Sequence, residues 1–201
     1  MVADYDEAKL KQILADPDMI KFEDKAKANI QNAREFKKII KHFGSFHDYV
    51  GSFNAQGSSG NSVKLKDDLR GRFARMGLIT PYHFMMDIGL PVMKPDRVVA
   101  RIFYRLRLIP REKIKYDSDA EAVVRQGEQF ATATGHPIRY IDIVFVCYGQ
   151  VRSIDIGLAQ GICLGDKPRC KVCKVTNDCN YFRNHHSKTR PLAVARFLPG
   201  P

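Results

Sequence analysis

Apolar positions along the chain recur at spacings of three and four residues, which is the pattern of helices that bury one face. Residues 4–16 carry such a stripe at Leu10, Ile13 and Leu14. Residues 23–43 carry a longer stripe, which closes at Gly44. A glycine directly after the last apolar position is a common helix end. The pattern therefore predicts a short helix and then a long one in the first quarter of the chain.

The same spacing continues through most of the remaining sequence. It predicts further helices over residues 62–77, 80–89, 96–109 and 118–135, the last with Ser118 and Glu121 at the spacing of a capping box. The strongly apolar residues 137–150 fit a buried helix or a strand, and the proline at their start favours the helix. We therefore expect an all-α fold, with small helices and loops around the cysteines near the C-terminus.

A composition change divides the chain. Residues 54–62 are rich in Gly, Ser and Asn, which predicts a mobile loop. We expect one helical lobe over residues 1–94, a second over residues 95–185 that carries the cysteines, and a tail over residues 186–201.

Charge narrows the classes of function. The 201 residues are 44% hydrophobic, a globular value, and the net charge is +11. Such a surplus indicates a polyanionic partner, most often nucleic acid, although a basic surface can also serve solubility alone. No apolar run reaches the ~18–20 residues of a membrane span, and the N-terminus lacks a signal-peptide pattern. We expect a cytoplasmic protein without a membrane partner, in which structural disulfides are disfavoured.

Four of the five cysteines gather near the C-terminus with the spacing C-x6-C-x2-C-x5-C, at Cys163, Cys170, Cys173 and Cys179. Zinc sites often use two C-x2-C pairs, but only one is present. One compact loop around a [4Fe–4S] cluster fits the spacing better, and zinc remains the alternative. The fifth, Cys147, is expected to be an inert buried thiol.

Cations lie between and beside the four cysteines. Lys167, Arg169 and Lys171 could dock the loop on nucleic-acid phosphates, or they could only offset the negative charge of the metal centre.

The cysteine spacing, the "KPRC" inside it and the aromatic residue after Cys179 resemble the iron–sulfur loop of endonuclease III and the adenine glycosylases. This likeness covers residues 91–182. Residues 7–90 are similar instead to 3-methyladenine DNA glycosylase I, through "NAREF", "GSF", "LKDDLRGRFARMG" and "YHFM". Together these resemblances imply the helix-hairpin-helix DNA glycosylase fold with a C-terminal [4Fe–4S] loop. They also imply that the N-terminal helices which carry the base-recognising residues of the second family are missing.

The resemblance assigns roles to individual residues. A hairpin that keeps the family's glycine at Gly77, and includes Thr80, would contact a DNA phosphate. Asp96 matches the catalytic carboxylate that stabilises the oxocarbenium-like sugar. Taken alone, an Asp before a helix is more often an N-cap, and Asp87 is the second candidate carboxylate.

The likeness also indicates the type of enzyme. No lysine lies between Lys66 and Lys94, where bifunctional relatives carry the Schiff-base amine, so we expect a monofunctional glycosylase. Tyr82, His83 and Phe84 could line the base pocket, although Tyr82 and Phe84 fit the core equally well. The implied function is excision of damaged purines, of the alkylated 3-methyladenine type, from double-stranded DNA by a monomer. The alternative is a non-catalytic iron–sulfur module that binds DNA.

Overall fold

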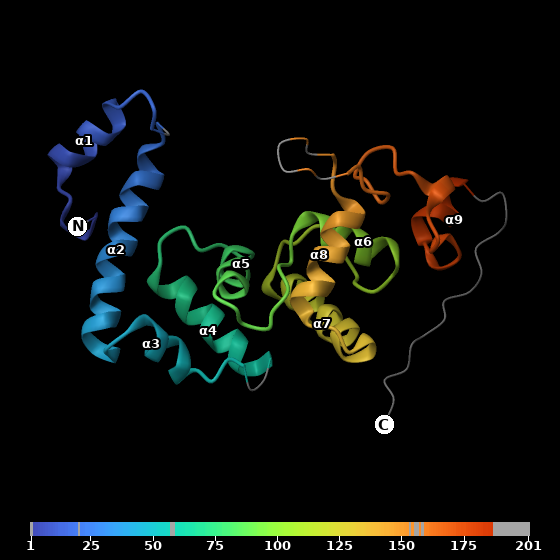
Figure 1. Ribbon diagram of the computed structural model, residues 1–201, viewed down its shortest axis with the longest axis horizontal. Helices are drawn as coiled ribbons and strands as arrows, with labels where there is room; N and C mark the ends of the chain where they lie inside the picture. The colour runs from blue at the N-terminus through green and yellow to red at the C-terminus, as the bar shows by residue number, and fades with distance from the viewer. Residues whose placement is uncertain are drawn as a thin grey trace. The chain divides into compact units, whose positions relative to one another are not determined.

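The structure is a computed structural model that describes residues 2–19, 21–56, 59–152, 154, 157 and 159–186. All regular secondary structure in these residues is helical, which confirms the predicted all-α class (Figure 1). The chain forms two compact units, and the boundary between them falls between Lys94 and Pro95. In the described residues, no helix is both long and apolar enough to cross a membrane.

The first unit is built from five α-helices and a leading 3₁₀ turn. These are η1 (Val2–Asp4), α1 (Glu7–Ala15), α2 (Glu23–Phe43), α3 (Phe46–Ser52), α4 (Ser59–Arg72) and α5 (Thr80–Asp87). The long α2 ends at Gly44, whose φ of 86° few side chains tolerate, as the pattern predicted. α4 already begins at Ser59, so the end of the predicted loop over residues 54–62 is helical, and residues 57 and 58 lie outside the described residues.

Aromatic packing holds α2, α3 and the segment after α4 together. The ring of Phe36 on α2 lies 4.7 Å from that of Phe46 and 4.9 Å from that of Phe73, between ring centroids. Tyr49 is completely buried, and its hydroxyl donates to Asp68 at 2.6 Å. A buried phenol with a satisfied hydroxyl adds apolar area without leaving a polar group unpaired.

The described part of the second unit begins with helices that pack against one another, as Figure 1 shows. These are α6 (Arg97–Arg105), α7 (Asp117–Thr134) and α8 (Ile138–Gly149). Residues 137–150 are thus helical, as their proline start indicated. α6 and α8 cross closely at Gly149, where a Cβ atom would come within 2.6 Å of Val98 Cγ1. The ring of Phe103 then packs 4.9 Å from that of Phe145.

The start of α7 differs from the predicted capping box. The helix begins at Asp117, and the carboxylate of Asp119 accepts the backbone N–H groups of Lys115 and Tyr116 at 3.0 and 3.1 Å. The expected pair of Ser118 and Glu121 was therefore set too far along the chain. After α8 the cysteine segment forms η2 (Cys170–Val172), η3 (Thr176–Asp178) and α9 (Asn180–His186). Of the predicted tail, only His186 is among the described residues.

Candidate functional site

The segment between α4 and α5, residues 73–79, occupies the place of the predicted hairpin. Asn32 of α2 holds it through both atoms of its side-chain amide: its Oδ1 accepts from the backbone N–H of Ala74 at 2.7 Å, and its Nδ2 donates to the Ala74 carbonyl at 3.2 Å. Phe73 is buried beside Phe36. One amide and one aromatic anchor therefore fix this segment onto α2.

The exposed end of the segment is open to a ligand. Gly77 is exposed, and a Cβ atom placed on it would meet nothing within 4 Å. The following helix α5 has no side-chain N-cap, and Thr80 at its start is exposed. Uncapped amides at a helix start attract anions. Gly77 is therefore not needed for packing, but it leaves the backbone accessible.

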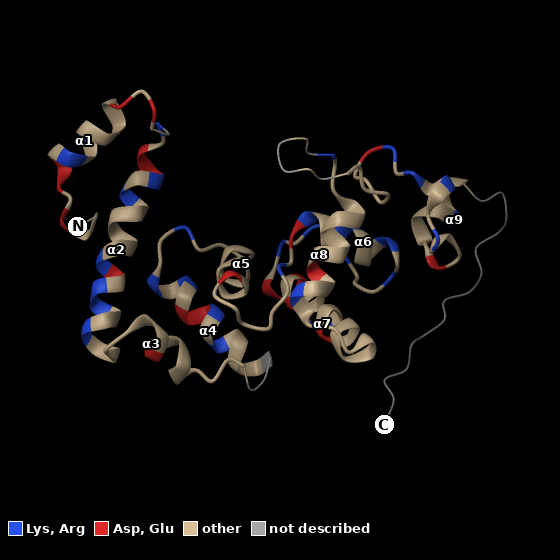
Figure 2. Cartoon of the chain, viewed as in Figure 1, with Lys and Arg blue, Asp and Glu red and all other residues tan. Residues whose placement is uncertain are grey.

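A basic hollow of about 600 Å³ lies beside Gly77. Figure 2 shows the basic residues at the end of α4 and in the loop after it. The cations among the lining residues come from these two places, so the hollow could accept an anion such as a phosphate. Its lining comprises Gln31, Arg70, Gly71, Arg72, Phe73, Ala74, Arg75, Met76 and Gly77.

Arg75 is the cation of this hollow that the sequence interpretation missed. Its φ is 65°, and its guanidinium lies 5.2 Å from the centroid of the Phe22 ring. No ion pair of Arg75 occurs in the part of the chain that the structure describes, whereas Arg72 pairs with Asp68 and Glu35. The available signal was the run "RGRFAR", which ends two residues before the hairpin glycine.

Asp96 caps the N-terminus of α6. Its Oδ1 accepts from the backbone N–H groups of Val98 and Val99 at 2.8 and 3.0 Å. This geometry confirms the capping interpretation. The side chain is half-buried, and within the described residues its Oδ2 has no hydrogen bond. One carboxylate oxygen is thus engaged in structure and the other is left for a ligand. Asp87, in contrast, is exposed and pairs with His83 at 3.2 Å.

The three residues predicted for the base pocket do not share one environment. Tyr82 is 1% exposed and packs in the core, which agrees with the core alternative. Phe84 is half-buried, 5.8 Å from the ring of Phe46. His83 faces solvent. None of the three lines the basic hollow beside Gly77, so their role in a base pocket stays a prediction.

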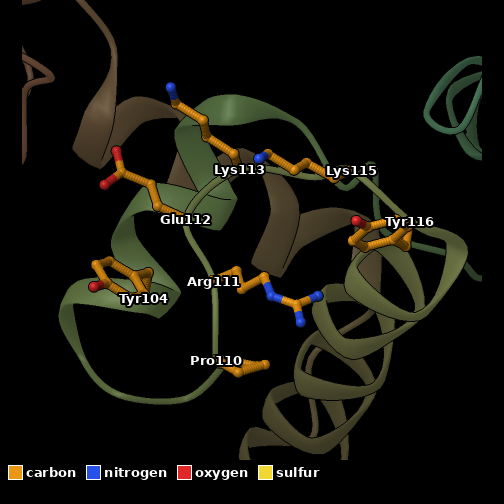
Figure 3. A pocket seen from close by; sticks show the side chains of 7 residues that line it. All are labelled: Tyr104, Pro110, Arg111, Glu112, Lys113, Lys115 and Tyr116. Atoms are coloured by element: carbon orange, nitrogen blue, oxygen red, sulfur yellow. The ribbon is translucent and has the colours of Figure 1, made fainter.

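Another cavity, of about 430 Å³, lies beside Tyr104 in the last turn of α6, whereas Asp96 caps the start of that helix. Figure 3 shows the side chains that line this cavity. Its lining comprises Tyr104, Pro110, Arg111, Glu112, Lys113, Lys115 and Tyr116. The Arg111 guanidinium bonds Asp119 at 3.1 Å and lies 5.4 Å from the centroid of the Tyr116 ring. Since α6 separates this cavity from Asp96, the cavity does not supply a base pocket next to that carboxylate.

The cysteine segment is attached to the last turn of α8 by its backbone. Gly161 donates to the carbonyl of Gln150 at 3.0 Å, and Ile162 and Cys163 both donate to that of Tyr148, at 2.7 and 2.9 Å. A Cβ atom at Gly161 would stand 2.6–2.9 Å from three carbonyl oxygens of this turn. Only glycine therefore allows the approach that places Cys163 against the helix end.

The four thiols share one electrostatic environment. Burial raises the pKa of Cys170, and the charges of Cys179, Cys173 and Cys163 raise it further. Burial also raises the pKa of Cys163, against the opposing effect of Arg105. Nevertheless, no three His, Cys, Asp or Glu side chains of the described residues converge closely enough to hold a single metal ion. The four thiols are therefore neighbours without meeting at one point.

The fifth cysteine was predicted wrongly. Cys147 is exposed rather than buried, because the face of α8 that packs on the unit carries Ile138, Ile141 and Gly149 instead. Cys147 is therefore a surface residue of α8, outside the C-x6-C-x2-C-x5-C segment.

Two arginines of α6 reach the cysteine segment. Arg101 donates to the carbonyls of Gly149 at 2.6 Å and Cys163 at 3.1 Å, and Arg105 donates to the sulfur of Cys163 at 3.3 Å. Burial, and then the charge of Arg105, lower the pKa of Arg101. Two partly desolvated guanidinium groups thus stand side by side next to the thiols, an environment that favours an anion.

The predicted phosphate-contacting cations lie on the surface of the same segment. Lys167, Arg169 and Lys171 are all exposed. Arg169 donates to the carbonyl of Gln160 at 3.2 Å, and Lys167 has a φ of 46°. Among the described residues, neither Lys167 nor Lys171 forms an ion pair, so their charges are available to a partner.

Comparison with known proteins found a family match for the N-terminal part of the chain. Residues 1–96 match the family model for methyladenine glycosylase, a stretch that contains the whole first unit and ends at Asp96. The cysteine segment lies outside the match. No solved structure matches the chain. The family match, over slightly less than half of the 201 residues, supports a DNA glycosylase family for this protein.

Proposed function

We propose that the protein is a monofunctional DNA glycosylase of base excision repair that hydrolyses the N-glycosidic bond of alkylated purines of the 3-methyladenine type. The observation that carries the proposal is the family match over residues 1–96, which includes the exposed hairpin and Asp96. The basic hollow beside Gly77 and the uncapped start of α5 support contact with a DNA backbone.

Asp96 would provide the catalytic charge. During hydrolysis, water adds to C1′ of the sugar as the bond to the base nitrogen breaks, and positive charge develops on the sugar. The free Oδ2 of Asp96 can stabilise this charge while Oδ1 keeps the carboxylate fixed on α6. With no lysine between Lys66 and Lys94, no amine of that stretch could form a Schiff base and cut the strand.

We also propose that Cys163, Cys170, Cys173 and Cys179 hold a [4Fe–4S] cluster. The segment supplies the four thiolate ligands that a cubane takes, and it contains only one of the two C-x2-C pairs that zinc sites often use. The adjacent Arg101 and Arg105 suit the net negative charge of a thiolate-bound cluster. When bound, the cluster would fasten the segment that carries Lys167 and Lys171, and it would supply a one-electron redox centre.

The alternative is a DNA-binding module without catalysis. Its support is that Asp96 lines neither the basic hollow nor the cavity beside Tyr104, and that Tyr82 belongs to the core. A binder needs the hairpin and the basic segment but does not need the carboxylate of Asp96.

Single-turnover release of 3-methyladenine or 7-methylguanine from methylated duplex DNA distinguishes the two. Asp96→Asn keeps an N-cap side chain and removes the charge, so the rate should fall by about a hundredfold or more. Binding to an abasic-site duplex should persist, because the charge acts mainly on the transition state. Asp87→Asn neutralises the second candidate carboxylate, and it should leave the rate unchanged if Asp96 is the catalytic group. If the parent protein released no base from DNA with any of several lesions, the glycosylase proposal would be wrong and the non-catalytic DNA-binding module would be favoured.

A further inference from the structure

Arg105, at the end of α6, carries a buried charge without a carboxylate partner. Its residue is 6% exposed, and none of its contacts in the described chain is an ion pair with Asp or Glu. Its Nη1 donates to the sulfur of Cys163 at 3.3 Å and to the Leu164 carbonyl at 2.7 Å, and its Nη2 donates to the Gly165 carbonyl at 3.2 Å. The guanidinium also lies 4.1 Å from the centroid of the Tyr181 ring.

A buried, unpaired cation is costly, so the anion that compensates Arg105 must come from the cysteines. Two carbonyls and one aromatic face contact the guanidinium of Arg105, but these groups are neutral and do not cancel its charge. The sulfur of Cys163 is the one contact that becomes negative when the thiol binds a metal. Arg105 is therefore placed to respond to the charge of whatever the thiols hold.

Tyr148, in the last turn of α8, makes a matching contact with a second cysteine. Its hydroxyl lies 3.1 Å from the sulfur of Cys173. Either atom could donate in this contact, but once Cys173 binds a metal it has lost its own proton, and the phenol is then the donor. Two different helices thus each present one hydrogen-bond donor to a different thiolate.

We propose that Arg105 and Tyr148 set the reduction potential of the centre bound by the four cysteines. This inference rests on the proposed iron–sulfur cluster and is independent of glycosylase activity. Hydrogen bonds to cluster sulfurs and nearby positive charge favour the more negative, reduced state, and so they raise the potential. Arg105 contributes a full charge from a buried position and therefore has the larger effect, whereas Tyr148 contributes one hydrogen bond.

The test is a redox titration of the iron-loaded full chain, followed by its visible absorbance, together with the iron content per chain. Tyr148→Phe removes only the hydroxyl, and it should keep the iron of the parent while lowering the midpoint potential. Tyr140→Phe, on the exposed side of the same helix, should change neither quantity. Arg105→Gln should lower the potential more than Tyr148→Phe does. Arg105→Lys, which keeps the charge, should restore part of the difference.

The outcomes separate this inference from the proposed cluster. A parent chain that binds no iron when it is folded would show that the cluster assignment is wrong, and the inference would fall with it. An iron-loaded parent and an iron-loaded Tyr148→Phe variant with equal potentials would overturn the inference alone. Tyr148→Phe also decides the matter if the Arg105 variants do not fold, since it removes one oxygen atom and no charge.

Discussion

The hairpin of the first unit and the cysteine segment of the second are both loops fixed to a helix, but the forces that fix them differ. Neutral contacts hold the hairpin: the amide of Asn32 satisfies both backbone groups of Ala74, and Phe73 enters an aromatic core. The cysteine segment instead gathers four thiols, three of them partly buried and one buried, beside the buried charge of Arg105. The hairpin is complete with protein atoms alone, whereas the cysteine segment gathers charges that a bound anion would balance.

The largest expected effect follows from this difference. Cys173→Ser should remove the bound iron and expose residues 161–179 to protease, while cleavage in the first unit stays as in the parent. In the proposed cluster, the substitution removes one of the four thiolate ligands. Iron analysis and mass spectrometry of limited digests measure both effects.

Cys147→Ser is the matched control, because this thiol is exposed and lies outside the segment of the four proposed ligands. A Cys173→Ser protein that kept the iron and the protease resistance of the parent would contradict the assignment of this ligand.

The next prediction compares the stability effects of replacing Gly161 in the cysteine segment and Gly77 in the hairpin. Gly161→Ala places a Cβ atom within 2.9 Å of the carbonyl oxygens of Cys147, Tyr148 and Gln150, so the backbone must move. We expect a loss of about 1–3 kcal/mol in the free energy of unfolding, as for other overpacked sites. Gly77→Ala meets nothing within 4 Å and should leave stability unchanged. Urea unfolding measures both, and equal midpoints for Gly161→Ala and the parent would show that the segment can shift without cost.

A substitution of Asn32 tests whether its uncharged hydrogen bonds to Ala74 hold the hairpin on α2. Asn32→Ala leaves the N–H and the carbonyl of Ala74 without their partner, which should cost about 1–3 kcal/mol. Hydrogen exchange at residues 73–79 should accelerate, and the iron content should not change. Gln31→Ala, the neighbouring residue on α2, is the control. Exchange as slow as in the parent would indicate that Phe73 alone holds the hairpin.

Sequence patterns predicted those features that depend on local spacing. The apolar stripe and the following glycine gave the extent of α2, and the proline before Ile138 correctly favoured a helix. The cysteines could be identified as a cluster because their spacing in one short segment limits how far apart they can lie. Asp96 could be recognised as a cap for the same local reason.

Contacts between distant residues could not be predicted in this way. The bonds of Asn32 to Ala74 and of Arg105 to Cys163 join residues 42 and 58 positions apart, and nothing in the local pattern marks either pair. Cys147 was misjudged because an apolar helix such as α8 does not reveal which of its faces is covered. The start of α7 was placed late because Asp119, Ser118 and Glu121 offer overlapping capping patterns.

DNA binding should draw on cations of both units. Replacing Lys167 and Lys171 together by alanine should weaken binding to an abasic-site duplex several-fold. It should also reduce the slope of log affinity against log salt by about 0.9 for each phosphate that the variant no longer neutralises. Arg75→Ala should have a similar effect per charge if the hollow beside Gly77 binds the backbone. Lys11→Ala, on α1, is the control. An unchanged slope in the Lys167 and Lys171 variant would remove the cysteine segment from the DNA interface.

The smallest expected effect concerns two carboxylates of α7 whose pKa values move in opposite directions. The backbone N–H of Lys115, followed by that of Tyr116 and the Arg111 guanidinium, lowers the pKa of Asp119 despite its burial. Burial raises the pKa of Glu128, and the charge of Arg125 opposes this only in part. Asp119 therefore stabilises the fold above its unfolded pKa of about 4, and this contribution is lost as the pH falls through its lower folded value. Glu128 contributes stability at low pH, and that contribution is lost as the pH rises through its raised folded value.

Unfolding by urea between about pH 6 and pH 2 separates the two. On acidification the parent loses the contribution of Asp119 and gains that of Glu128. Asp119→Asn should therefore lose less stability than the parent below about pH 4, although it is less stable at neutral pH. Glu128→Gln should lose more than the parent over the acidic range, because the compensating gain is gone. If both variants followed the pH profile of the parent, neither carboxylate would control the acid stability of the second unit, and its sensitivity to acid would have to arise elsewhere in that unit.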